Sequence, residues 1–502
     1  MCCDIMDKEI QCNITAFLII LSITLLLSFP YSNVGLERDE GSYLLIASKI
    51  LRRGVPYKDI TENKPIALYF FLTIPVYLLG SWINGLRVFG FILIALTAFI
   101  IFLIGKNLKD IELGFLSSFI FILLQLFTPL MLGFLILSEN ISNLFIVLAI
   151  YLLLSKKLSP GVAFLIGILS SFAFLTRQTS LFLVAIIPLY IYYNKEIKQK
   201  FDFICYFLLG ITLLIAIAAF YLFLNSALWD ALYNTFLSML DPYGPYATYD
   251  AGSLTSLKFY ALFYFISDKL VIIFLMLLGI INLQNIKDKF ILLWFFVSLI
   301  SAQISPSMYL HYYIIILPAL SLLVGIGSKS ILEGGKIFYE NKKIYHLFTL
   351  IFIIALSILL ILQFSYFAPY PLFAMDTGKA YIDTLSYNEE ILIANFIRNT
   401  SYDENIFVFP SEPQIYYLTG KDSISKMPLF NDVWFANANY SEINRLILQP
   451  LSEKRPKYII IANNLHFEYI NKTTNGRIFM QYVNKYYHPS REIGIAQIYE
   501  IN

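Results

Sequence analysis

Two adjacent carboxylates, Asp39 and Glu40, follow the first apolar segment of the chain and have Arg38 beside them. A carboxylate near hydrocarbon is costly unless water or a cation compensates its charge, so this group predicts a hydrated pocket at a membrane face. A carboxylate in such a pocket is suited to take a proton from a hydroxyl group, as a general base does. The alternative is an ordinary loop in which both side chains are simply solvated.

Three further segments contain residue types suited to binding an anion. Lys64 stands at the predicted start of a helix, where its ammonium group and the helix N-terminus both favour negative charge. Arg177 lies in a short turn between two apolar runs, and His311 with Tyr312 precedes another apolar run. The alternatives are a lysine that only anchors its helix, an arginine at a membrane interface and an aromatic belt.

Composition determines the class of protein. Of 502 residues, 58% are hydrophobic and only 14% are charged, and apolar runs recur along most of the chain. These proportions predict a polytopic α-helical membrane protein. The formal net charge of +2, with basic residues distributed over many loops, argues against a nucleic-acid partner. The four cysteines include no CxxC pair, so neither a zinc site nor a disulfide framework is indicated.

The apolar runs predict about 11 membrane spans, several of them shorter than the roughly 20 residues of a typical span. The first, Thr15 to Phe29, is interpreted as a retained anchor because Phe29-Pro30-Tyr31 lacks the small residues of a cleavage site. The others lie near residues 83–105, 114–132, 141–154, 161–175, 179–193, 203–225, 270–284, 290–305, 309–326 and 345–366. The segment Pro65–Gly80 is short and contains two prolines, so we expect an interfacial or re-entrant helix that does not cross.

The distribution of lysines over the loops distinguishes the two sides of the membrane. If Pro65–Gly80 does not cross, the loops on one side contain Lys106, Lys109, Lys156, Lys157, Lys195, Lys198, Lys200, Lys287, Lys289, Lys329, Lys336, Lys342 and Lys343. The opposite short loops contain only Arg177, Lys258 and Lys269. The positive-inside rule then places the lysine-rich loops in the cytoplasm, and the Asp39 loop and the C-terminal region outside the cell membrane.

The residue composition and pattern of the chain change after the last apolar run. Residues 1–366 are predicted to form the membrane domain, and residues 367–502 a small extracytoplasmic α/β domain. Short β-prone runs in the second region, separated by amphipathic stretches, lie at Ile406–Phe409, Tyr458–Ile461 and Ile495–Tyr499. The sequons at Asn399, Asn439 and Asn471 agree with a position outside the cell. No P-loop or dinucleotide fingerprint occurs, so any energy source must arrive with the substrate.

In combination, these segments resemble the GT-C glycosyltransferases, and among them the protein O-mannosyltransferase and aminoarabinose-transferase group, often called family 39. The first outer loop of that group is similar to Asp39-Glu40-Gly41-Ser42-Tyr43, Gly54-Val55-Pro56-Tyr57-Lys58-Asp59 and Glu62-Asn63-Lys64-Pro65. Its second acidic position resembles Ser138-Glu139-Asn140, and later landmarks resemble Thr176-Arg177-Gln178-Thr179 and His311-Tyr312-Tyr313. Two positions depart from the pattern: the usual Lys-Pro-Pro is Lys64-Pro65-Ile66, and Glu139 stands where Asp is frequent.

The resemblance implies a membrane glycosyltransferase. The donor would be a sugar linked to a polyprenyl phosphate, such as dolichyl phosphate mannose, and the acceptor a hydroxyl group of a protein, glycan or lipid in the cell envelope. Asp39 would be the general base, Glu40 would organise the site or the acceptor, and Glu139 would be the second acid. A base acting opposite a departing phosphate implies a single displacement with inversion. The residues implied for the donor phosphate are Lys64, Arg177, His311 and Tyr312.

Three points stay open at the level of the sequence. Related mannosyltransferases are thought to need no metal, so no cofactor is predicted, although Asp39, Glu40 and Glu139 offer the oxygen ligands of a divalent cation. The segment Asp241–Tyr246, rich in Pro, Gly and Tyr, is either a mobile lid or a passive loop. The alternative function is a transporter or flippase of polyprenyl-linked lipids or glycolipids, for which we would expect internal repeats that the sequence does not contain.

Overall fold

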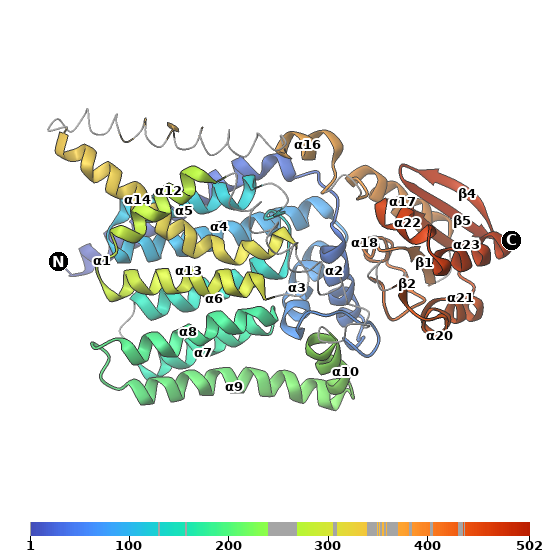
Figure 1. Ribbon diagram of the computed structural model, residues 1–502, viewed down its shortest axis with the longest axis horizontal. Coiled ribbons are helices and arrows are strands. Elements are labelled where there is room, and N and C mark those ends of the chain that lie inside the picture. The colour runs from blue at the N-terminus through green and yellow to red at the C-terminus, as the bar shows by residue number, and fades with distance from the viewer. Residues whose placement is uncertain are drawn as a thin grey trace. The chain divides into compact units, whose positions relative to one another are not determined.

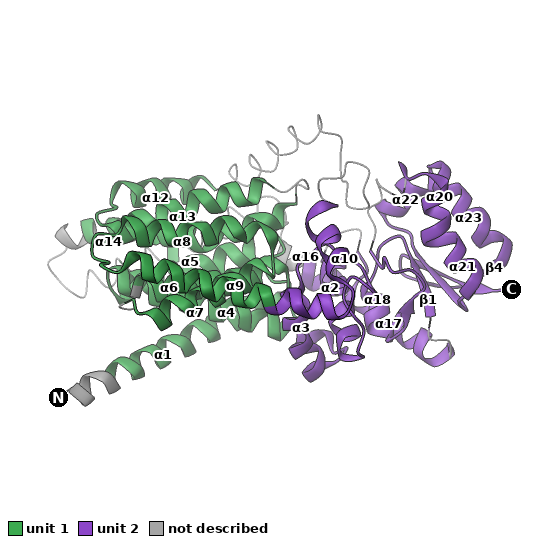
Figure 2. Ribbon diagram, turned by 90° about the horizontal axis from the view of Figure 1, so that it is seen from below, with its two compact units in different colours: residues 1–32, 87–216, 255–372 green, residues 33–86, 217–254, 373–502 purple. Residues whose placement is uncertain are grey.

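The computed structural model describes residues 2–128, 131–155, 158–238, 269–304, 309–338, 370–380, 384–401, 405–429 and 437–502, and positions 349, 351, 354, 355, 358 and 435. The chain divides into two compact units, each built from three stretches of sequence. Unit 1 comprises residues 1–32, 87–216 and 255–372, and unit 2 comprises residues 33–86, 217–254 and 373–502 (Figure 2).

Unit 1 is a bundle of apolar helices that lie side by side (Figure 1). Its helices are α1 (Cys2–Ser28), α4 (Ile83–Leu108), α5 (Ile111–Phe127), α6 (Ser138–Ser155), α7 (Pro160–Phe174), α8 (Leu181–Tyr193), α9 (Lys200–Leu224), α12 (Leu270–Ile281), α13 (Ile286–Gln303) and α14 (Leu317–Phe338). Residues 83–86 of α4 and 217–224 of α9 belong to unit 2. Side-chain caps determine where several of them begin. Asp110 accepts a hydrogen bond from Leu113 N at the start of α5, and Ser159 caps α7 directly before Pro160.

The predicted apolar runs lie on these helices. Among the described residues, four helices are long and apolar enough to cross a membrane: Lys8–Tyr31, Ile83–Leu108, Lys200–Leu224 and Leu310–Gly334. The prediction of a multi-pass helical membrane protein is therefore confirmed. The last predicted run, residues 345–366, lies for the most part outside the described residues. The count of about 11 spans stays a prediction.

The lysines predicted to be cytoplasmic meet acidic side chains at one end of unit 1. Lys106, near the end of α4, lies 3.3 Å from Glu9 of α1, and Lys109 lies 2.7 Å from Glu333 near the end of α14. Since α5 leads away from this end and α14 leads towards it, the starts of α6 and α14 lie at the other end of the bundle (Figure 1). This arrangement agrees with the predicted separation of lysine-rich loops from Glu139 and His311.

Unit 2 contains the predicted small α/β domain. Among the described residues, its sheet has the strand order β2-β1-β3-β5-β4, in which β1 pairs in parallel with β2 and β3, and β5 is antiparallel to β3 and β4. The strands are β1 (Asn405–Phe409), β2 (Asp422–Ser423), β3 (Tyr458–Ala462), β4 (Tyr487–Ile493) and β5 (Ala496–Ile501). The helices of this region are α16 (Tyr370–Thr377), α17 (Tyr387–Thr400), α18 (Gln414–Thr419), α20 (Tyr440–Ile443), α21 (Gln449–Lys454), α22 (Leu465–Asn471) and α23 (Thr474–Tyr486).

Alternating side chains of the sheet form the core of this domain. Phe407 and Phe409 of β1 point to the same side, where the Phe409 ring stacks on Phe479 of α23 at 4.1 Å between centroids. Ile459 and Ile461 of β3 belong to the same core. Each of these five side chains is at most 1% exposed, so the domain has a dry apolar centre of its own.

The segment predicted to be the first outer loop belongs to unit 2 as well, as α2 (Arg38–Leu51) and α3 (Ile66–Leu79). Before α3, Thr61 N donates a hydrogen bond to Lys426 O at 2.8 Å. After α3, the Tyr417 hydroxyl donates to Gly80 O, and Arg398 Nη2 donates to Ser81 Oγ at 2.9 Å. Both ends of α3 thus contact the same α/β domain. With 14 residues, α3 is about 21 Å long against a hydrocarbon core of about 30 Å. These contacts favour the prediction that Pro65–Gly80 does not cross.

The predicted division of the chain at residues 366 and 367 lies outside the described residues and stays a prediction. The compact unit that contains the α/β domain also takes in residues 33–86. Sequence-local composition could not indicate this, because the loop and the domain are separated by nearly 300 residues of chain.

Cysteine accessibility tests the topology. Single cysteines placed at Ser81 and Ser452 of a Cys-free protein should both react with a membrane-impermeant reagent added from outside intact cells. Ser81 follows α3, and Ser452 lies on the exposed surface of α21. Labelling of position 81 from the cytoplasm alone, with position 452 labelled from outside, would mean that α3 crosses the membrane.

Candidate active site

The predicted acidic pair lies at the start of α2. Glu37 is the N-cap residue, and its carboxylate accepts a hydrogen bond from Asp39 N at 2.7 Å. Glu40 Oε2 accepts in return from Glu37 N at 3.1 Å, which completes a capping box. The Glu40 side chain is fully buried, whereas Asp39 is partly exposed. Glu40 therefore organises the first turn of α2, and Asp39 is the more accessible of the two carboxylates.

Glu37 is a third acid of this group, one that sequence reasoning did not single out. Burial raises the pKa of the Glu37 carboxyl well above its ordinary value, and the negative charge of Asp39 raises it further, while Arg38 opposes both. Glutamate is an unusual N-cap residue, so the sequence contains no common capping pattern at this position. Asp39 thus lies beside a carboxyl group that resists ionisation.

Lys64 lies at the entry to α3 in the same unit. It precedes Pro65, the N-cap residue of α3, and its side chain is buried. The Tyr57 hydroxyl donates to Lys64 O at 2.7 Å, and burial raises the pKa of this hydroxyl far above its ordinary value, so it remains a donor. Glu62 accepts from Ser42 Oγ at 2.7 Å, which connects the entry of α3 to α2. The structure thus brings Asp39, Glu40 and Lys64 into one folded segment.

A second cluster lies in unit 1, at the end of the bundle opposite the lysine-rich end. Glu139 is in the first turn of α6, and Arg177 is the N-cap residue of η2 (Gln178–Ser180), between α7 and α8. His311 and Tyr312 lie in η4 (Leu310–Ile316), directly before α14. These four predicted residues, separated by up to 173 positions, are all 7% exposed or less.

Electrostatic contacts hold this cluster together. Arg177 Nη1 donates to Glu139 Oε1 in a buried ion pair, and His311 Nε2 lies 3.7 Å from the same oxygen. Arg177 Cζ lies 4.6 Å from the centre of the Tyr312 ring, a cation–π contact. Ser138 Oγ donates to Glu139 Oε2 at 2.9 Å. The guanidinium group is therefore fixed on two sides, by a carboxylate and by an aromatic face.

Tyr309 connects the cluster to the surface. Its ring stacks on His311 at 5.4 Å between centroids, with only 8° between the planes, and Tyr309 is 48% exposed. His311 meets Tyr312 edge to face at 4.8 Å. The imidazole is thus held between two tyrosine rings, one buried and one accessible.

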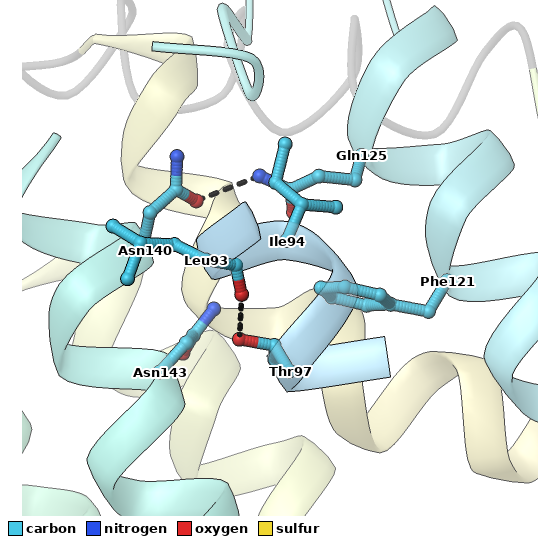
Figure 3. A pocket seen from close by; sticks show the side chains of 7 residues that line it. All are labelled: Leu93, Ile94, Thr97, Phe121, Gln125, Asn140 and Asn143. Carbon is cyan, nitrogen blue, oxygen red and sulfur yellow. Dashed lines mark hydrogen bonds between the residues drawn. The ribbon is translucent and has the colours of Figure 1, made fainter. Parts of the chain in front are cut away.

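Buried amides support the segment that leads to Glu139. Residues 131–137 are irregular and buried, so their backbone groups need partners within the protein. Gln125 Nε2 donates to Gly133 O at 2.7 Å and to Asn140 Oδ1 at 2.6 Å, and Asn140 Nδ2 donates to Leu135 O at 2.6 Å. Figure 3 shows Gln125 and Asn140 pointing toward each other across a small pocket. The sequence offers only a weak indication of these supports, namely isolated amides in apolar surroundings.

Two predictions are not tested by the described residues. Within the described part of the chain, no three His, Cys, Asp or Glu side chains are close enough to hold a metal ion together. The need for a cation, predicted as absent, stays a prediction. The predicted lid, Asp241–Tyr246, lies outside the described residues.

Comparison with known proteins concerns the fold. No family model and no curated protein matches the sequence. ArnT from Cupriavidus metallidurans is similar over 98% of both chains at 10% identity, with a TM-score of 0.62 in the apo state and 0.61 bound to undecaprenyl phosphate. The archaeal oligosaccharyltransferase AglB from Archaeoglobus fulgidus, in complex with an inhibitory peptide and a dolichol-phosphate, is similar over 97% of this chain and 74% of its own, at 10% identity and a TM-score of 0.51. The arabinofuranosyltransferase AftD from Mycobacteria is similar over 97% of this chain and 40% of its own, at 12% identity and a TM-score of 0.50. All three are GT-C superfamily glycosyltransferases. The chain has the GT-C fold.

The GT-C resemblance predicted from the sequence is therefore confirmed for the fold. Within this GT-C fold, the predicted site residues form two groups. One group lies in unit 2 and contains Asp39, Glu40 and Lys64, and the other lies in unit 1 and contains the Glu139–Arg177 pair with its two aromatic neighbours. Their roles in a reaction stay predictions.

Proposed function

We propose that the chain is a membrane glycosyltransferase that moves a sugar from a polyprenyl-phosphate donor to an acceptor hydroxyl group. The observation that carries the proposal is the buried cluster of Glu139, Arg177, His311 and Tyr312 in a GT-C helix bundle. A guanidinium group beside an imidazole offers donors suited to a phosphate, and both come from helix ends at one end of the bundle. ArnT bound to undecaprenyl phosphate and AglB in complex with a dolichol-phosphate support the lipid-phosphate donor.

The reaction needs a base and a phosphate site. In the proposal, Asp39 takes the proton from the acceptor hydroxyl as that oxygen attacks the anomeric carbon. The polyprenyl phosphate leaves from the opposite face, and the residues predicted from the sequence to balance its charge are Lys64, Arg177 and His311. Within unit 1, the Tyr312 ring contacts the Arg177 guanidinium group. One displacement of this kind inverts the anomeric configuration. The acceptor is a hydroxyl group of a protein, a glycan or a lipid.

The proposed face is extracytoplasmic. The lysine-rich end of unit 1 is the expected cytoplasmic side, and the Glu139–Arg177 cluster is at the other end of the same bundle. A donor carried by a polyprenyl chain suits an outer face, because nucleotide-activated sugars are absent there and the sequence contains no nucleotide-binding motif.

A donor panel tests the proposed function. Purified protein in lipid nanodiscs is incubated with polyprenyl-phosphate-linked hexoses and pentoses and with peptide, glycan and lipid acceptors, and both products are followed by mass spectrometry. We expect one donor to yield free polyprenyl phosphate and a glycosylated acceptor. A parallel reaction with chelator decides whether a divalent cation takes part, a relevant question because an oligosaccharyltransferase from Archaeoglobus fulgidus has been solved in complex with Zn and sulfate. Translocation of labelled lipid in proteoliposomes without consumption of any donor would favour the flippase alternative instead.

A further inference from the structure

The loops that follow β1 and β3 bring polar side chains to one edge of the α/β sheet. β1 ends at Phe409 and is followed by Glu412, whereas β3 ends at Ala462 and is followed by Asn464. Adjacent parallel strands place such loops together, and in open α/β sheets this edge is where ligands bind. Here Asn464 Nδ2 donates to Glu412 Oε1 at 2.9 Å, so the two loops meet.

Arg38 of α2 occupies this edge. Its Nε and Nη2 atoms donate to Glu412 Oε1 at 3.2 and 3.1 Å. Glu412 is fully buried and the Arg38 side chain is only 12% exposed. Gln414 Nε2 donates to the other carboxylate oxygen of Glu412 at 2.6 Å. A buried carboxylate with this set of donors has its charge and its lone pairs compensated, and most of the compensation depends on Arg38.

His466 of α22 makes a third contact with the same guanidinium group. Its Nε2 lies 2.7 Å from Arg38 Nη1. Arginine can only donate, so His466 Nε2 accepts in this contact. Arg38 is thus held by the loop after β1 and by α22 of the α/β domain at once.

The contacts on either side of Arg38 leave little room for α2 to move. A Cβ atom at Gly41 would lie 2.5 Å from Gln414 N, so α2 and α18 approach as closely as a glycine permits. Leu36 N donates to Glu390 Oε2 of α17 at 2.9 Å. The α/β domain therefore contacts the start of α2 before, at and after Arg38.

We propose that the α/β domain is a positioning device for α2, in which Glu412 and His466 hold Arg38 and thereby fix the turn that contains Asp39. Asp39 directly follows Arg38 in the first turn of the helix. The proposal rests on the proposed function of Asp39 as general base, which must lie within hydrogen-bond reach of the acceptor hydroxyl. A displacement of about 1 Å at such a position can cost about 100-fold in rate. Arg38, Glu412 and His466 are positioning residues and touch no substrate in this scheme.

Glu412→Gln tests the device, because it keeps the shape of the side chain and removes its charge. We expect kcat to fall by about 10- to 100-fold while the dissociation constant for the polyprenyl-phosphate donor stays nearly unchanged. We also expect faster amide hydrogen exchange in residues 36–45 and unchanged exchange in β3, which reports that the domain remains folded. Arg38→Met removes both the charge and the planar guanidinium group, and it should lower kcat as well. Arg38→Lys keeps the charge but not the forked hydrogen-bond donors of the guanidinium, so its kcat should be higher than that of Arg38→Met.

Glu468→Gln is the matched control, since Glu468 is an exposed acid on α22, the helix that contains His466. It should change neither kcat nor exchange. Unchanged kcat or unchanged exchange in residues 36–45 of Glu412→Gln would overturn the proposal. If the wild-type protein consumes no donor at all, the proposed function fails, and the exchange experiment still decides whether Glu412 fixes α2.

Discussion

Replacing Asp39 by asparagine should lower kcat by about 10²–10⁴ while donor binding survives. Asparagine keeps the shape of the side chain, so the capping box formed by Glu37 and Glu40 stays in place. It cannot accept the proton of the acceptor hydroxyl, so only the transition state loses an interaction. Steady-state kinetics with the donor identified from the panel, together with direct measurement of donor binding, checks both parts.

Lys64→Ala should weaken donor binding, in contrast to Asp39→Asn, which should lower kcat while donor binding survives. Loss of a charge-assisted contact to phosphate costs about 1.5–3 kcal/mol, which is more than tenfold in donor affinity. We therefore expect a raised dissociation constant for the donor. Unchanged donor affinity in a folded Lys64→Ala protein would reduce this lysine to an anchor of α3.

The product of the wild-type reaction provides an independent test. A single displacement inverts the anomeric configuration of the donor, and NMR of the product reports it. Full turnover by Asp39→Asn, or a retained configuration, would contradict the role of Asp39. A retained configuration would also require a second displacement and a covalent intermediate on another carboxylate. Glu40 is a poor candidate in this fold, because it is fully buried and caps α2. Glu139 would be examined first.

Sequence patterns predicted the apolar helices and three of the five strands among the described residues, β1, β3 and β5, because these have local causes, whereas β2 and β4 were not predicted. The apolar runs from Thr15 to residue 326 lie for the most part on helices, the run 345–366 lies mostly outside the described residues, and the run at Tyr458–Ile461 lies within β3. The individual chemistry-bearing residues were also visible in the sequence as charged or aromatic positions next to apolar runs. Their grouping was less visible. The contacts among Glu139, Arg177 and His311 join residues up to 172 positions apart, and no periodicity encodes a separation of that length.

The residues that the sequence did not reveal were missed for two reasons, a large separation along the chain and an uncommon helix cap. Glu412 and His466 are ordinary polar residues in loops or short helices of the α/β domain, and their partner Arg38 is more than 370 positions away. Only the fold shows that Arg38 lies beside the loops that follow the parallel strands β1 and β3. Glu37 was missed because a glutamate N-cap is uncommon, so the pattern that usually indicates a capping box was absent.

Breaking the Glu139–Arg177 ion pair should produce the largest loss of stability among these variants. Both side chains are buried, at 1% and 4% exposure, so removing either charge leaves the other without its ion-pair partner in a buried site. Glu139→Gln and Arg177→Met should each destabilise unit 1 by about 3–5 kcal/mol, and the double variant by less than the sum of the two. Thermal unfolding of the purified protein in one detergent measures all three. Asp110→Asn is the control, because it keeps the cap of α5 and its partner Lys329 still has Glu112 and Glu333 nearby.

The same variants separate a structural arginine from one that binds phosphate. In the double variant neither buried charge is left without its partner, so most of the stability should return. Donor affinity should not return with it if the guanidinium holds the donor phosphate, and this divergence between stability and binding is the expected result. Two outcomes would contradict it. Recovery of donor affinity along with stability would make Arg177 only the counter-ion of Glu139, and additive destabilisation would mean that the two side chains do not stabilise each other.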